Sequence, residues 1–245
     1  MIFSPLPAEQ LGLAQRTKTM NEMAAVTLPE GAATTSRRSI ATWIGLLFSL
    51  FGMLIVRQVI RVAFPAGDTV SVAIREAVYF AGAALLLLLV TRLEKLPLTS
   101  IGLGTSTWWK SLAWGLVTAV ICAALALILI RLTGYGQGAS PIDRLPLWLL
   151  TTVVFRAGIV EELFYRGYAI ERLQAVGLRR RAAAIIPLAI FSVGHWTGGA
   201  ANILIAAVLG GVLTLFYLAR RDLVANMFAH TLVDFVANVV PRLFA

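Results

Sequence analysis

Seven long apolar stretches dominate this sequence and limit what it can fold into. Most approach the roughly 20 apolar residues that a helix needs to cross a bilayer. A bilayer interior has no water to bind backbone groups, and barrel strands would alternate in hydropathy, so these stretches must be helices. They are 41–64, 70–90, 112–130, 145–170, 182–196 (the shortest), 201–219 and 223–240. We therefore predict an all-α, polytopic transmembrane bundle of seven to eight spans, the eighth being a re-entrant element.

Composition supports a membrane protein. The chain is 59% hydrophobic and 13% charged, whereas soluble domains carry about 25% charged residues. A net charge of +9 would suggest nucleic acid in a soluble protein, but here the basic residues lie in short loops between apolar stretches, so we expect no nucleic-acid partner. Residues 1–40 are polar and lack an apolar signal core. We expect a disordered cytosolic tail there, followed by the bundle at 41–245.

The distribution of basic residues predicts the orientation in the membrane. With the N-terminus in the cytoplasm, the inner segments hold thirteen Lys and Arg residues and the outer segments only three, Arg131, Arg144 and Arg242. Cytoplasmic loops carry the excess of positive charge in membrane proteins. The sequence therefore predicts a cytoplasmic N-terminus and an outer C-terminus, in a bacterial inner or plasma membrane.

Ionisable residues inside the later stretches indicate a functional site. Each charged group at the centre of a span costs about 2.5–3.5 kcal/mol on insertion scales, so it is expected to be paired or used. Four charged residues of the first two stretches, Arg57, Arg61, Arg75 and Glu76, lie near span ends, and we expect them to snorkel to the surface as structural residues. The later residues are Arg156, Glu161, Glu162, Arg166, Glu171, His195, His230 and Asp234.

The densest cluster contains two adjacent carboxylates. Glu162 and Arg166 are four residues apart, so on an α-helix they share a face and can neutralise each other. Glu161 is rotated by about 100° from Glu162 and points elsewhere. The spacing predicts that Glu162 is paired and that Glu161 is free.

The only two histidines, His195 and His230, fall in later stretches. Asp234 follows His230 by four residues and shares its face, and Phe191 precedes His195 by one turn and can pack beside it. One free glutamate, two histidines and one aspartate thus occupy three late helices. Such a set is typical of a functional site.

These residues resemble the motifs of a known family. Glu161–Glu162–x3–Arg166, Phe191–x3–His195 and His230–x3–Asp234 are similar, in that order, to motifs of the CPBP (Abi, or CAAX-protease and bacteriocin-processing) intramembrane proteases, which include the type II CAAX prenyl endopeptidases. The resemblance covers a core at about 145–240. It implies seven or eight helices around a catalytic cavity that opens toward the cytoplasmic side.

The resemblance also implies a role for each matching residue. Glu161 corresponds to the glutamate that activates water, and Glu162 and Arg166 to a supporting ion pair. His195, His230 and Asp234 complete the catalytic site. Many members carry Asn at the last position, and an Asp carboxylate cannot donate the amide hydrogen bond that Asn can.

Two versions of the mechanism remain open from the sequence. In the first, which we favour, Glu161 is the general base and His195 and His230 orient the substrate or stabilise the oxyanion, without a metal. In the second, Glu161, His195 and His230, with or without Asp234, bind Zn²⁺ and activate a bound water. The chain contains no HExxH motif, in which two zinc-binding histidines share one helix.

The leading hypothesis is an intramembrane endopeptidase that cleaves a membrane-associated protein or peptide within the lipid bilayer. In a bacterium, we expect such a substrate rather than a prenylated protein. A second hypothesis is a non-catalytic immunity or scaffold protein with the same fold. A third is a small transporter that uses the carboxylates as an ion relay, although the chain shows no paired broken helices.

Overall fold

The computed structural model describes residues 40–64, 68–136 and 144–244, and every regular element within these ranges is a helix. Helix covers most of each of the seven predicted stretches. Five helices are long and apolar enough to cross a membrane: Ile40–Ala63, Thr69–Leu93, Trp108–Thr133, Trp196–Arg220 and Leu223–Leu243. The predicted tail lies outside the described residues, except for Ile40.

The other two predicted spans differ from these five. α6 (Leu147–Arg156), η4 (Ala157–Ile170) and α7 (Glu171–Ala175) form one uninterrupted helix that carries the charged cluster. α8 (Arg180–Val193) has 14 residues, fewer than the roughly 20 that a straight span requires. A total of seven to eight spans therefore stays a prediction.

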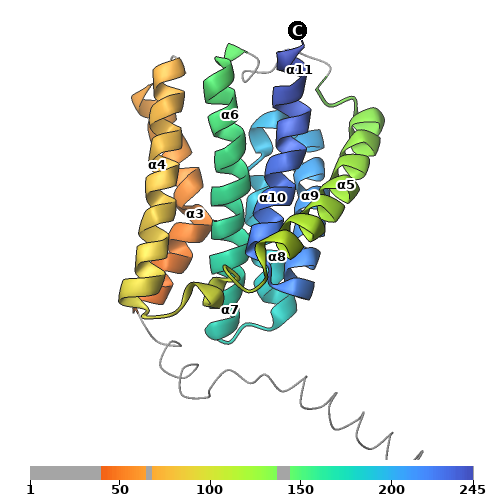
Figure 1. Ribbon diagram of the computed structural model, residues 1–245. Helices are drawn as coiled ribbons and strands as arrows, with labels where there is room; N and C mark the ends of the chain where they lie inside the picture. The colour runs from red at the N-terminus through yellow and green to blue at the C-terminus, as the bar shows by residue number, and fades with distance from the viewer. Residues whose placement is uncertain (1–39, 65–67, 137–143, 245) are drawn as a thin grey trace, which may run out of the picture.

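The helices run up and down in a bundle (Figure 1). α3 (Ile40–Ala63) begins at the lower end of the view, and the C-terminus lies at the upper end. α4 (Thr69–Leu88), continued by η1 (Leu89–Leu93), descends beside α3, and the α6–η4–α7 helix descends near the centre. The bundle thus places the ends of α3 and α8 and the start of α4 at the same end as the C-terminus.

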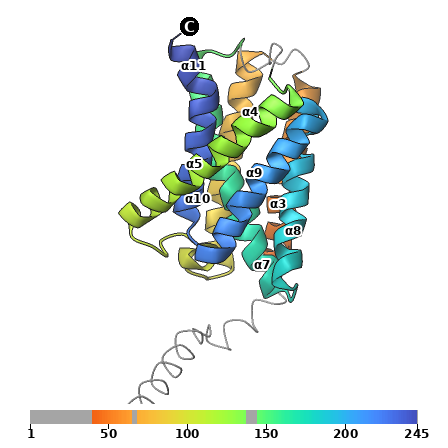
Figure 2. The ribbon, with the colours of Figure 1, turned by 90° about the vertical axis from the view of Figure 1, so that its right-hand side faces the viewer.

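The last helices enclose η4 on its other sides. α8 leads through a short 3₁₀ turn, η5 (Trp196–Gly198), into α9 (Gly199–Arg220). α10 (Leu223–Asp234) continues as η6 (Phe235–Val239) and α11 (Val240–Leu243). α5 (Trp108–Thr133) runs obliquely across α9 and α10 (Figure 2).

The core gathers around η4, since all but one of its residues are buried. Large apolar side chains on the outer helices remain exposed, as expected for surfaces that face lipid. Tryptophans occupy the first turns of three helices, with Trp43 in α3, Trp108 in α5 and Trp148 in α6. Tryptophan is enriched where a helix enters the membrane surface, so these positions fit interfacial belts.

Gly158 sets the distance between η4 and α10. A Cβ atom at Gly158 would overlap the hydroxyl of Thr231 and lie 2.7 Å from its backbone nitrogen. Only glycine permits this approach, which brings α10 and His230 against the charged face of η4.

η4 has the wide winding of a π-helix over Ala157–Ile170. π-Helices form hydrogen bonds from residue i to residue i+5, are rare, and occur often at functional sites. Because the turn is wider than in an α-helix, residues five apart lie closer to a common face. This local geometry changes which charged side chains meet.

Candidate active site

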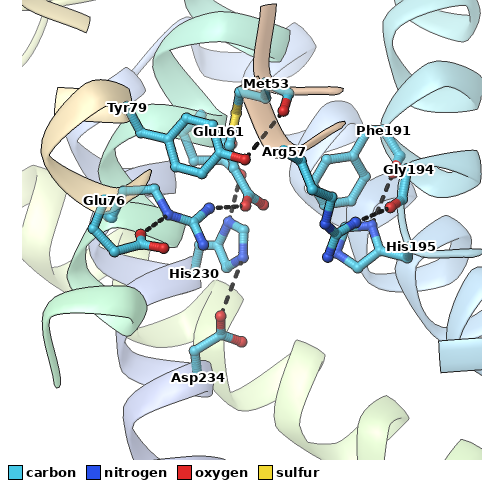
Figure 3. A network of polar contacts seen from close by, with 12 residues as sticks. Met53, Arg57, Glu76, Tyr79, Glu161, Phe191, Gly194, His195, His230 and Asp234 are labelled. Atoms are coloured by element: carbon cyan, nitrogen blue, oxygen red, sulfur yellow. Dashed lines mark hydrogen bonds and ion pairs between the residues drawn. The ribbon is translucent and has the colours of Figure 1, made fainter. Parts of the chain in front are cut away.

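Arg156 links two carboxylates at the upper part of η4. Its Nε donates to Glu76 Oε2 at 2.6 Å and its Nη1 donates to Glu161 Oε1. Arg75 donates through Nε and Nη2 to the other Glu76 oxygen, at 2.9 and 2.7 Å. These four residues form a continuous chain of ion pairs between α4 and η4, of which Figure 3 labels Glu76 and Glu161.

Two expectations from the sequence are wrong here. Glu161 was expected to be free, but the π-helical winding places it near Arg156, five residues earlier. Glu76 was expected to snorkel, but it is 1% exposed and lies inside the bundle between Arg75 and Arg156. A buried carboxylate needs a cationic partner, and Arg156 supplies one to both glutamates.

Glu162, which is itself fully buried, is the centre of a second cluster. Arg166 donates to Glu162 Oε1 at 2.8 Å, which confirms the predicted pair. His230 Nδ1 lies 2.8 Å from the same oxygen, and Asn226 Nδ2 donates to Oε2 at 3.0 Å. Glu162 therefore fixes the position of the His230 ring.

The other nitrogen of His230 faces Asp234. Nε2 lies 3.6 Å from Asp234 Oδ2, so the two residues share a face as predicted, at a distance slightly too long for a direct hydrogen bond. A water molecule can bridge polar groups at such a separation. Asp234 is partly open, with a side chain 33% exposed.

His195 lies where α8 ends. The helix stops at Val193, and His195 has non-helical backbone angles before the turn of η5. Its Nδ1 is 2.8 Å from the Phe191 carbonyl oxygen, and Asn202 donates to the His195 carbonyl at 3.0 Å. This break in the helix turns the His195 ring inward, toward the cavity that it lines.

The Phe191 ring lies against both imidazoles. The distance between ring centroids is 4.7 Å to His195, which confirms the predicted packing, and 6.3 Å to His230. The guanidinium of Arg166 lies 4.4 Å from the same ring. Phe191 thus connects the three motifs from one position on α8.

A cavity of about 90 Å³ lies beside these groups. Glu161 and His195 both line it, together with Arg156, Arg57 and Tyr165. Of the three residues that the motifs select as catalytic centre, the cavity walls formed by the described residues include these two but not His230. Figure 3 shows Glu161 and His230 on one side, with Phe191 and His195 on the other.

The side chains do not form a metal-binding cluster in this arrangement. Within the described parts of the chain, no three His, Cys, Asp or Glu residues come close enough together to hold an ion. His230 is directed to Glu162 and Asp234, and Glu161 to Arg156. The donor set of Glu161, His195 and His230 therefore does not fit Zn²⁺ as placed.

A second hollow lies next to the cavity, toward the end of the bundle that holds the C-terminus. It has a larger volume, about 730 Å³, and shares Leu54, Arg57, Arg75 and Gly194 with the lining of the cavity. The end of α3, the start of α4 and the η5 turn line this hollow. If the N-terminus lies in the cytoplasm, as the basic residues predict, this hollow faces the outer side of the membrane. The predicted orientation and the cytoplasmic opening that the resemblance implies therefore exclude each other.

The sequence interpretation missed several residues of the site. Arg57, Tyr165 and Glu76 were not selected, and Arg156 had no assigned partner, although all four lie at or beside the cavity. The sequence signal that could have pointed to Glu76 was the adjacent charged pair, Arg75 and Glu76, within one apolar stretch. Asn226, a polar residue in the last stretch, was the signal for the buried amide on Glu162.

The fold and the site define a helical membrane protein with buried ion pairs and a small polar cavity between its late helices. Residues 143–236 match the family model described as type II CAAX prenyl endopeptidase Rce1-like. The match confirms the resemblance for this part of the chain, and supports a CAAX-protease-type intramembrane endopeptidase in general. No curated protein and no solved structure matches the chain.

Proposed function

We propose that the protein is an intramembrane endopeptidase in which Glu161 activates a water molecule. The observation that carries the proposal is that Glu161 and His195, from different helices, line one cavity inside the bundle. A carboxylate and an imidazole beside a space of water size are the groups that water-dependent peptide hydrolysis requires. The matching family model supports the same class of reaction.

Glu161 offers one oxygen to the reaction. Arg156 occupies Oε1, while Oε2 accepts no hydrogen bond from the described residues. A water in the cavity would donate a proton to Oε2 as its oxygen attacks the peptide carbonyl carbon. The new C–O bond gives a tetrahedral oxyanion. Glu161 would then pass the proton to the amide nitrogen, and the C–N bond would break as the oxyanion collapses to the carboxyl group and the amine leaves.

His195 would orient the water or the substrate. A carbonyl oxygen only accepts hydrogen bonds, so Nδ1 must carry the proton that reaches Phe191. In the neutral ring Nε2 is then an acceptor. It can accept from the attacking water or from a substrate N–H group, but it cannot donate to an oxyanion.

The donors to the oxyanion would come from other residues. The Arg156 guanidinium and the Tyr165 hydroxyl both line the cavity, and Tyr165 makes no hydrogen bond to another described residue. Preorganised donors of this kind stabilise charge that develops in the transition state. His230, held by Glu162 and facing Asp234, would position α10 and bind substrate or water.

The decisive experiment compares Glu161→Gln and His195→Ala with the wild-type protein on a mixture of quenched fluorescent apolar peptides in detergent micelles. We expect at least about a hundredfold loss of cleavage for each variant, as removal of a general base costs about 10²–10⁴. Size-exclusion chromatography checks folding. Wild-type rates in either variant would refute the assignment.

The non-catalytic alternative has one observation in its favour, since the Arg156–Glu161 ion pair would also be expected in a purely structural cluster. The same variants separate the two functions. After Glu161→Gln, an immunity or scaffold protein would keep its function in cells, whereas a peptidase would lose its cleavage activity.

A further inference from the structure

One face of α5 carries a stripe of exposed side chains. Lys110, Trp114, Val117 and Ile121 are spaced so that each lies about one helical turn after the last, on a common face. The three apolar members are between 40 and 49% exposed, so this face is not covered by another helix of the described chain. The stripe begins with a cation, continues with an aromatic ring and ends with two aliphatic side chains.

The end of α9 adds a second cation to this stripe. α5 packs obliquely against α9 (Figure 2), and Arg220 lies in the last turn of α9. Its guanidinium carbon is 3.5 Å from the centroid of the Trp114 ring. A guanidinium stacked on an indole is attracted by the face of the ring and keeps its N–H groups at the edge, where they can bind an anion. Two cations, Lys110 and Arg220, therefore neighbour the same indole ring.

Neither of these cations has an acid partner. Lys110 and Arg220 are exposed and form no ion pair with a carboxylate among the residues that the structure describes. Asp222, two residues after Arg220, is buried instead, where it accepts a hydrogen bond from Ser111 at 2.7 Å and caps α10. The positive charge of this surface is therefore left for a ligand from outside the chain.

The stripe has the polarity and the length of one leaflet of a bilayer. Tryptophan is enriched at the membrane surface, so Trp114 is placed to lie at the level of the lipid headgroups. From Lys110 to Ile121 the helix rises by about 16 Å, and the hydrocarbon region of one leaflet is about 15 Å deep. A phospholipid bound here would have its phosphate beside the two cations and its acyl chains beside Val117 and Ile121.

We propose that Lys110 and Arg220 bind the headgroup of an anionic phospholipid whose acyl chains lie along the exposed face of α5. Basic side chains near a membrane surface attract anionic lipid by about 1 kcal/mol each, and their hydrogen bonds to a phosphate are charge-assisted. A second copy of the chain fits this face less well, because a symmetric contact would bring the same cations together. The proposal does not depend on the peptidase function.

The binding test compares two lipids with the same acyl chains. The full chain in detergent micelles is titrated separately with dioleoyl-phosphatidylglycerol, which is anionic, and dioleoyl-phosphatidylcholine, which has no net charge. Native mass spectrometry counts the protein molecules that carry one lipid. We expect phosphatidylglycerol to bind at least about fivefold more tightly, in keeping with the attraction of two cations.

Variants assign the preference to this site. The double variant Lys110→Gln with Arg220→Gln should bring the ratio of the two affinities close to one, and both side chains are exposed, so folding is not threatened. Trp114→Leu should lower the ratio several-fold, because Arg220 loses the ring on which it stacks.

The matched control is Arg92→Gln. Arg92 is an exposed cation of η1, which continues α4 at the same end of the bundle but on the opposite side from α5 (Figure 1). It forms no ion pair with a carboxylate within the described ranges. This variant removes the same charge from the same end, and it should leave the ratio unchanged.

Three results would overturn the proposal: equal affinity for the two lipids, a ratio that survives the double variant, or an equal loss in Arg92→Gln. The last result would mean that anionic lipid follows the overall charge of this end rather than a site on α5. A dimer of the wild-type chain that the double variant abolishes, without any lipid preference, would assign the face to a second copy and also overturn the proposal.

Discussion

Arg156 is hydrogen-bonded to Glu161, five residues further along the same uninterrupted helix, and to Glu76 on α4. The π-helical winding of η4 allows the first contact, and the packing of α4 against α6 and η4 allows the second. One buried guanidinium therefore joins the proposed general base to a helix that carries none of the sequence motifs.

Removing Arg156 should destabilise the protein. Arg156→Met leaves Glu76 and Glu161 without this partner, and breaking a buried ion pair costs about 3–5 kcal/mol. The midpoint of thermal unfolding in detergent should fall clearly. The double variant Arg156→Met with Glu161→Gln removes the charge that is left without a partner, since Glu76 keeps Arg75, and should recover part of the loss; no recovery would mean that the Arg156–Glu161 pair is unimportant.

Replacing Glu161 or Glu162 by glutamine should affect cleavage and stability differently. Glu161→Gln abolishes cleavage but costs little stability, because Arg156 keeps Glu76 as a partner. Glu162→Gln weakens the contacts of a fully buried carboxylate with Arg166 and His230, and should lower the free energy of unfolding by about 2–4 kcal/mol. Equal unfolding midpoints for the two variants would contradict this division.

Gly158→Ala should push α10 away from η4. The added Cβ overlaps Thr231, and overpacking of this kind costs about 1–3 kcal/mol. Because Thr231 follows His230, cleavage should fall together with stability. Gly211→Ala is the control, since its Cβ meets only Leu188 at 4.0 Å, and both stability and cleavage should be kept.

Chelation should leave cleavage unchanged. No three described ligand side chains are placed to hold a metal, and Glu161 can take a proton from water without one. Incubation with EDTA or 1,10-phenanthroline, followed by removal of the chelator, is the measurement. Loss of activity that added Zn²⁺ restores would support the metal-dependent version.

Labelling of single introduced cysteines tests the predicted orientation, in which the N-terminus lies in the cytoplasm and the hollow faces the outer side. Cys122 is buried and should stay unlabelled in the native protein. A membrane-impermeant maleimide should label Thr197→Cys, at the hollow, in intact cells that express the protein. Ser106→Cys, in the exposed loop before α5 at the opposite end, should be labelled only after the cell membrane is opened; the reverse pattern would place the N-terminus outside.

The pairs at α-helical spacing could be predicted from the sequence. Glu162 with Arg166, and His230 with Asp234, are four residues apart, and both pairs lie as the spacing indicates. The partner of Glu161 could not be predicted, because a periodicity of 3.6 residues does not describe a π-helix. The inward position of Glu76 depends on Arg156, which is 80 residues away in the chain.

The sequence by itself determined that this chain is a bundle of membrane helices with charged groups inside it, because continuous hydropathy and local spacing follow from bonded geometry. Only the tertiary structure decided which charges meet. It joined Arg156 to Glu76 and Glu161, placed His230 on Glu162, and turned His195 into the cavity with Glu161. The physical reason is that a buried charge takes the partner that packing brings within reach, and packing depends on the whole bundle.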